Sequence, residues 1–135
     1  MKRIAIVLDK SLMIGAVGNV SAILMGQLIL RYPQIYSSEL VIDKAGNEHA
    51  AIQFSTIVLK AGQTQILNLC NSIKIDYPDL IFFLFTETGQ KLNNAFSEYK
   101  TKIASQHTKE LLPVAMIIYG DDNDVRKATK KFSVL

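Results

Sequence analysis

The chain has 135 residues, of which 49% are hydrophobic and 20% are charged, and its formal net charge is +3 at pH 7. This length suits one domain, residues 1–135, whose core can be large enough to fold without disulfides or a bound metal. The single cysteine, Cys70, excludes an internal disulfide and fits a reducing compartment, so we expect a cytoplasmic protein. The small positive charge is too weak a signal to indicate DNA as a partner.

The segment from Ser11 to Leu30 contains no charged residue. Its twenty residues would be long enough to cross a bilayer. The glycines within it and the central Asn19 argue against a span, and the apolar run after Lys2 and Arg3 is too short for a signal peptide. We therefore expect no association with a membrane.

Apolar runs and helical periodicity alternate along the remaining sequence. In chain order they predict a strand at Lys2–Leu8, a helix at Asn19–Arg31, a short strand at Leu40–Ile42 with a tight turn at Asp43–Asn47, a strand at Thr56–Lys60, a helix at Gln63–Ile75, a strand at Leu80–Phe85, a helix at Lys91–Ser105, a strand at Val114–Tyr119 and a helix at Asp124–Lys131. Four strong strands interleaved with four helices predict an α/β fold, a three-layer α/β/α sandwich with a parallel or mixed sheet.

Two helices carry further expectations. The first is apolar on all sides, so either the following segment or a second subunit must cover its outer face, and a homodimer is expected. On the second, Cys70 falls on the apolar stripe and is expected to be a small core residue.

Candidate ligand-binding residues follow the first strand, where ligands bind in open α/β sheets. Asp9 could orient water or bind a hydroxyl, or it could be a solvated strand end. Gly15, Gly18 and Asn19 precede the expected helix, whose free N–H groups would attract an anion. The alternative is a tight turn with Asn19 as helix cap. The spacing matches neither a dinucleotide fingerprint nor a Walker loop, so no cofactor is expected.

Other polar residues could likewise either bind a ligand or have only a structural role. Thr86 and Gln90 come just after a predicted strand and could hydrogen-bond a ligand or simply form the turn. His49 could be a catalytic base or a structural hydrogen-bond partner. Lys127, in the last helix, could face the site, although the acid-to-base order of that helix also complements its dipole. Two distant histidines and one cysteine make no metal signature.

Several local patterns together resemble a bacterial domain-of-unknown-function family, the one numbered two thousand. They are Ile4–Asp9 with Gly15 and Asn19, Asp43–His49, Val58–Ala61, Phe85–Thr86 with Gln90, Tyr99, Ile118–Gly120 and Val125–Leu135. The pattern of Val125, Lys127, Thr129 and Leu135 is also similar to the type II peptidyl-tRNA hydrolases, which cut the ester between a peptide and tRNA. The resemblance implies a four-stranded mixed sheet of strand order 2-1-4-3, a frequent dimer, and Lys127 and Thr129 at the site.

The chain departs from those hydrolases in its first loop, where they carry lysines and this sequence is apolar from Leu12 to Gly18. The first interpretation is therefore that the protein binds a small or nucleotide-like ligand at the strand ends, on a scaffold that lacks the basic catalytic loop. The alternative is hydrolysis of a peptidyl- or aminoacyl-RNA ester, with Asp9 or His49 activating water. The third is a homodimeric interaction protein.

Overall fold

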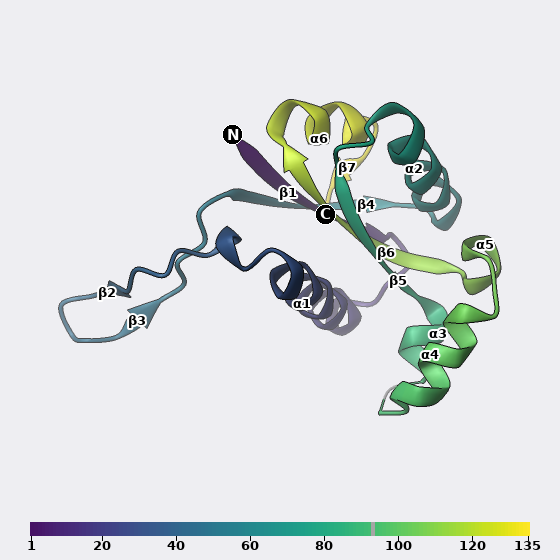
Figure 1. Ribbon diagram of the computed structural model, residues 1–135, viewed down its shortest axis with the longest axis horizontal. Coiled ribbons are helices and arrows are strands. Elements are labelled where there is room, and N and C mark those ends of the chain that lie inside the picture. Colours follow the sequence, from purple (N-terminus) through teal and green to yellow (C-terminus); the bar gives the residue numbers. More distant parts are fainter. Residues whose placement is uncertain (93) are drawn as a thin grey trace.

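Five strands form one mixed sheet in the order β5-β6-β1-β4-β7 (Figure 1). The computed structural model describes residues 1–92 and 94–135. The strands are β1 (Lys2–Asp9), β4 (Ser55–Ala61), β5 (Ile81–Thr86), β6 (Pro113–Asp121) and β7 (Ser133–Val134). β1 is parallel to β4 and antiparallel to β6, which is antiparallel to β5, and β7 is antiparallel to β4. The carboxyl ends of β1, β4 and β5 therefore share one edge of the sheet, here called the carboxyl edge, and the opposite edge is the amino edge.

The two central strands explain why the sheet is covered on both faces. In β1 every residue from Ile4 to Asp9 is buried, and in β6 every residue from Pro113 to Gly120 is buried. Alternate side chains of a strand point to opposite faces. Ala5 and Val7 pack toward α2 (Gln63–Asp76) and α6 (Asp122–Thr129), whereas Ile4 and Ile6 pack toward α1 (Ile14–Arg31). The expected three layers are thus present.

The order of the four predicted strands agrees with the expected 2-1-4-3, but the sheet has a fifth strand. That strand, β7, is two residues long and extends the sheet beyond β4, with Leu59 opposite Val134 and Lys60 opposite Ser133. Its shortness leaves no periodicity for a sequence pattern to detect. On the α2 side, Cys70 lies in the core as expected, and burial raises the pKa of its thiol.

The connection from β5 to β6 differs from the single helix expected at Lys91–Ser105. The helices there are α3 (Glu87–Lys91), α4 (Phe96–Ala104) and α5 (Thr108–Leu111), and the expected helix includes Asn93, which lies outside the described residues. The left-handed backbone of Asn94, with φ of 66°, is one physical reason for separate helices, because it cannot continue a right-handed α-helix.

α1 begins at Ile14, five residues before the predicted cap at Asn19. The extended backbone of Met13 precedes the first turn, and no side chain caps it. Glycines lower helix propensity without forbidding a helix. Gly15 and Gly18 are accommodated because the inward side chains of the same helix, Val20, Leu24 and Leu28, bind it to the sheet.

Residues 38–50 form an arm that projects away from the sheet and its helices (Figure 1). β2 (Val41–Ile42) and β3 (Glu48–His49) pair within it as an antiparallel hairpin. A turn joins them, in which one carboxylate oxygen of Asp43 accepts bonds from the backbone N–H of Ala45 and Asn47. The arm is anchored where the backbone N–H of Ser37 donates to Ala51 at 2.9 Å. The short strand and turn expected there are confirmed, and the arm they belong to was not anticipated.

Candidate functional site

Asp9 is a nearly buried carboxylate at the carboxyl edge, with 7% of its surface exposed. Its Oδ2 accepts a hydrogen bond from the hydroxyl of Ser11 at 2.5 Å, and its backbone carbonyl accepts one from the N–H of Leu12. The bond from Leu12 closes a turn that begins where the N–H of Lys10 still donates to Ala61 on β4. A carboxylate has about four acceptor positions, so Asp9 retains capacity to bind a further donor.

Thr86 is the second buried polar residue at this edge, with 4% of its surface exposed. Among the described residues no group hydrogen-bonds its Oγ1. The pairing of β5 with β6 shifts register between Phe85 and Thr86, and the Glu87 N–H donates to the carbonyl of Leu112. Buried side-chain hydroxyls in proteins nearly always have a partner, so an unused one at a strand end indicates a role beyond packing.

Strand register places Asp9 and Thr86 near one another. Leu8 on β1 and Phe85 on β5 both lie opposite Ala115 on the intervening β6. Asp9 and Thr86 each follow by one residue, so two strand spacings, about 10 Å, separate their backbones. The two buried polar side chains therefore lie near one another at the carboxyl edge, on either side of the start of β6.

Four other predicted site residues are placed on helices. Gly15, Gly18 and Asn19 lie inside α1 and are exposed, so the expected loop before the helix is wrong. The N–H groups without helical partners belong to the first turn, at Ile14, Gly15 and Ala16. Gln90 is exposed on α3, one turn after Thr86. Of these four, Gly15 and Gln90 remain beside the carboxyl edge.

His49 lies on the arm, away from Asp9. The arm leads into β4, whose first residue, Ser55, lies opposite Arg3 at the amino edge. The length of β1, about 23 Å, therefore separates Asp9 from the base of the arm. The Nε2 atom of His49 lies 2.7 Å from Oδ2 of Asp43. This hydrogen bond, with those from the Asn47 and Ala45 backbone, holds the pKa of Asp43 below its usual value. Within one chain, Asp9 and His49 do not form a joint catalytic site.

Lys127 and Thr129 lie on α6, which starts at the amino edge. The hydroxyl of Thr129 is buried and donates to the carbonyl of Val125 at 2.8 Å, so it serves the helix. Lys127 is exposed and borders a groove of about 520 Å³ between α2 and the C-terminal segment. The groove is lined by Gln65, Asn68, Leu69, Ser72, Asp76, Tyr77, Lys127, Ala128, Lys130, Lys131 and Phe132. The structure thus separates Lys127 from Asp9 and places it in a second, mainly basic concavity.

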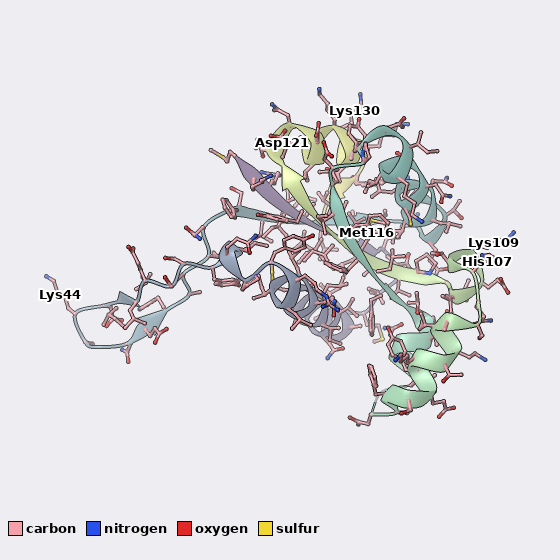
Figure 2. The ribbon with its side chains drawn as sticks, viewed as in Figure 1. Lys44, His107, Lys109, Met116, Asp121 and Lys130 are labelled. Carbon is pink, nitrogen blue, oxygen red and sulfur yellow. The ribbon has the colours of Figure 1, made fainter. Side chains whose placement is uncertain are left out.

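Two residues near the carboxyl edge were not predicted for the site. Ser11 bonds the Asp9 carboxylate, and the only available signal was its position two residues later in a polar turn. His107 precedes α5 and lies, with Lys109, where β6 begins (Figure 2). Both side chains point outward from that end of the molecule in Figure 2.

Among residues 1–92 and 94–135, no three His, Cys, Asp or Glu side chains gather as a metal site would require.

α1 has the length and composition of a membrane span. Its mean hydropathy is 1.4, and 17% of its residues are buried in the molecule. The buried side chains, Val20, Leu24 and Leu28, are those that pack on the sheet. A helix that covers one face of an α/β sheet passes the same test.

Comparison with known proteins gives two matches. The family model described as "Protein of unknown function (DUF2000)" matches residues 2–135. A solved structure of a protein of unknown function from Agrobacterium tumefaciens strain C58 is similar, with a TM-score of 0.85 and 20% sequence identity over 99% of this chain and 97% of that chain. At this identity the likeness concerns the fold alone. No curated protein matches the chain, and the similarity to type II peptidyl-tRNA hydrolases stays a prediction.

Proposed function

The chain belongs to the DUF2000 family of proteins of unknown function, and from its own residues we propose that it binds a small, hydroxyl-bearing ligand at the carboxyl edge, between Asp9 and Thr86. The observation that carries the proposal is the buried Thr86 hydroxyl, which no described residue hydrogen-bonds. Leaving such a group unpaired costs about 1–3 kcal/mol, and a ligand hydroxyl would recover that free energy. The remaining acceptor positions of Asp9 suit a second hydroxyl, as in a sugar or the ribose of a nucleoside.

The test is a thermal-shift titration with ribose, adenosine and adenosine monophosphate as probes. A probe that binds the native state raises the melting temperature in proportion to RT ln(1 + [L]/Kd). We expect at least one probe to stabilise the wild-type protein, and we expect Thr86→Val and Asp9→Asn to abolish the shift. Asn71→Ala, on the exposed surface of α2, is the control and should respond like wild type. A wild-type protein that responds to none of the probes, or variants that respond equally, would contradict the proposal.

The groove between α2 and the C-terminal segment supports a second candidate function, the binding of an anionic, nucleotide-like ligand. Lys127, Lys130 and Lys131 outnumber the single acid, Asp76, and the rings of Tyr77 and Phe132 could stack on a base. Its volume of about 520 Å³ lies in the usual range for small-molecule sites. A shift with adenosine monophosphate that persists in Thr86→Val but disappears in Lys127→Glu would assign the ligand to this groove.

The geometry gives less support to hydrolysis of a peptidyl- or aminoacyl-RNA ester. Asp9 would have to activate water without His49, because the two lie beyond opposite ends of β1. Release of peptide from an N-blocked aminoacyl-tRNA measures this activity directly. Turnover by the wild type that Asp9→Asn removes would favour the hydrolase, and a folded protein without turnover would leave the binding role.

A further inference from the structure

The exposed apolar side chains of this protein are concentrated on one side. Figure 1 shows α1 between the arm and α4. Among the described residues, eight of the fourteen exposed large hydrophobic side chains belong to these three features. α1 and its preceding residue contribute Met13, Ile14, Ile23 and Leu30. Isolated exposed apolar residues are ordinary, but a gathering of this size indicates a surface that is covered in the working protein.

The outer face of α1 is uncharged and built of small residues. Gly15, Gly18, Ala22 and Gly26 are exposed, and a Cβ placed on any of the three glycines meets nothing within 4 Å beyond its chain neighbours and the adjacent backbone of its own helix. Small residues let the backbone of a second helix approach closely. With the half-buried Ile29, these positions are spaced symmetrically about Ala22, at seven and four residues on either side. A helix that meets its own copy in antiparallel orientation brings such positions together.

The arm offers the complementary apolar surface. Its residues Leu40, Val41 and Ile42 are 71%, 46% and 49% exposed. A two-stranded hairpin is marginally stable by itself in water. The Asp43 turn and the Ser37–Ala51 anchor hold this one in a fixed shape. A preformed arm that exposes aliphatic side chains on both of its faces loses little entropy when it docks on a partner.

We propose that a second copy of the chain covers this side, with the two α1 helices packed antiparallel about a two-fold axis near Ala22. Antiparallel helices bring opposite ends of their dipoles together. The arm leaves the molecule beyond the C-terminal end of α1, so in this arrangement the partner's arm lies beside the N-terminal half of α1. At the middle of α1, Ile23 borders an open apolar hollow of about 380 Å³, whose other side chains include Phe85 of β5 and Phe96 of α4, the latter 73% exposed. The aliphatic side chains of the partner's arm dock on the first turn of α1, where Met13 and Ile14 are exposed.

The size of the surface fits a stable dimer. All thirteen residues of the arm are exposed, as are ten residues from Met13 to Arg31. A standard interface buries about 800 Å² and about 20–30 residues on each partner. An isologous contact uses the same patch twice, so α1 packs on the partner's α1 and each arm packs on the other copy. A membrane surface suits the patch less well, because helices that lie on bilayers carry a strongly basic polar face.

Sedimentation velocity from 1 to 100 µM tests the dimer. We expect wild type to sediment as a dimer and Ala22→Glu to be monomeric, with a dissociation constant raised at least 100-fold, because two carboxylates would meet at the axis. Asn71→Glu, equally exposed but on α2, should remain dimeric. Replacement of residues 38–50 by Asn-Gly, which joins chain ends already hydrogen-bonded at Ser37 and Ala51, should also weaken the dimer. Circular dichroism identifies variants that are folded monomers. A wild type that stays monomeric at 100 µM, or a dimer that persists in Ala22→Glu, overturns the proposal.

Disulfide cross-linking tests the antiparallel orientation. Cys70 is buried, so an introduced cysteine is the accessible thiol. We expect Ala22→Cys to form a covalent dimer on mild oxidation and Gly15→Cys to remain uncrosslinked, because in the antiparallel dimer residue 15 faces residue 29. Efficient cross-linking through Gly15→Cys would show parallel helices and overturn this docking of the arm. Binding of a monomeric wild type to phosphatidylserine vesicles would assign the surface to a membrane instead.

Discussion

Thr86 and Thr129 are both buried threonines, yet their hydroxyls differ in hydrogen bonding. Thr86 Oγ1 has no partner among the described residues, whereas Thr129 Oγ1 donates to Val125 at 2.8 Å. Valine has nearly the same shape without the hydroxyl. We expect Thr86→Val to raise the free energy of unfolding by about 1 kcal/mol and Thr129→Val to lower it by a similar amount. Urea denaturation at one fixed protein concentration measures both.

The contrast between the two threonines separates a ligand-binding residue from a structural one. Residues that are kept at a stability cost are characteristic of functional sites. If both substitutions destabilise the protein equally, the Thr86 hydroxyl is satisfied in solution and the site at the carboxyl edge loses its main support.

The Asp43–His49 pair makes the turn of the arm sensitive to acid. The hydrogen bond from His49 is the largest cause that lowers the Asp43 pKa from 3.8. A carboxyl with a lowered folded pKa contributes stability above its unfolded pKa, and that contribution is lost as the pH falls through the folded value. We expect the Asp43 carboxyl carbon to titrate below 3.8 by NMR, and His49→Ala to move the midpoint upward. An unchanged midpoint in that variant would show that the histidine bond does not form in solution.

At the scale of elements, α6 and α1 differ in how they begin. Asp121 caps α6, because its Oδ2 accepts bonds from the N–H of Asn123 and Asp124 at 3.1 and 3.3 Å. Met13 leaves α1 without a side-chain cap or an acidic residue in its first turn. We expect Asp121→Ala to cost about 1 kcal/mol of unfolding free energy. Because Met13 lies on the proposed dimer surface, Met13→Asp is made in the monomeric Ala22→Glu variant, where we expect it to add about 1 kcal/mol. Thermal unfolding followed by circular dichroism checks both, and a neutral Met13→Asp would mean that another group already satisfies the first turn.

The strands could be predicted from the sequence more accurately than the helix boundaries. Strands buried on both faces leave uninterrupted apolar runs, such as Leu80–Phe85, which lies within one residue of β5. The start of α1 was predicted five residues late because Gly15 and Gly18 suggested a loop. Local propensity cannot show that packing against the sheet outweighs two glycines. The two-residue β7 leaves no pattern to read.

At the scale of the whole molecule, strand direction decided which candidate residues meet. Asp9 and Thr86 were correctly placed at one edge, because β1 and β5 end on the same side of the sheet. Lys127 was expected beside them, but it lies toward the other edge of the sheet. β6 runs antiparallel to β1, so α6 starts at the amino edge, where Asp121 lies opposite Lys2. The position of His49 depended on the arm, whose projection follows from tertiary structure that periodicity does not encode.

The proposed dimer gives the whole molecule a stability that depends on its concentration. When a dimer unfolds to two separate monomers, its free energy of unfolding rises by about 1.4 kcal/mol per dimer for each tenfold rise in protein concentration. For a chain of this size we expect the melting temperature of wild type to rise by about 2–4 °C per decade. Ala22→Glu should melt at one temperature at all concentrations, because its monomer unfolds alone. Differential scanning calorimetry from 5 to 500 µM measures the slope. A flat wild-type profile would mean that α1 and the arm are stable without a second copy, and that their apolar surfaces serve some other partner.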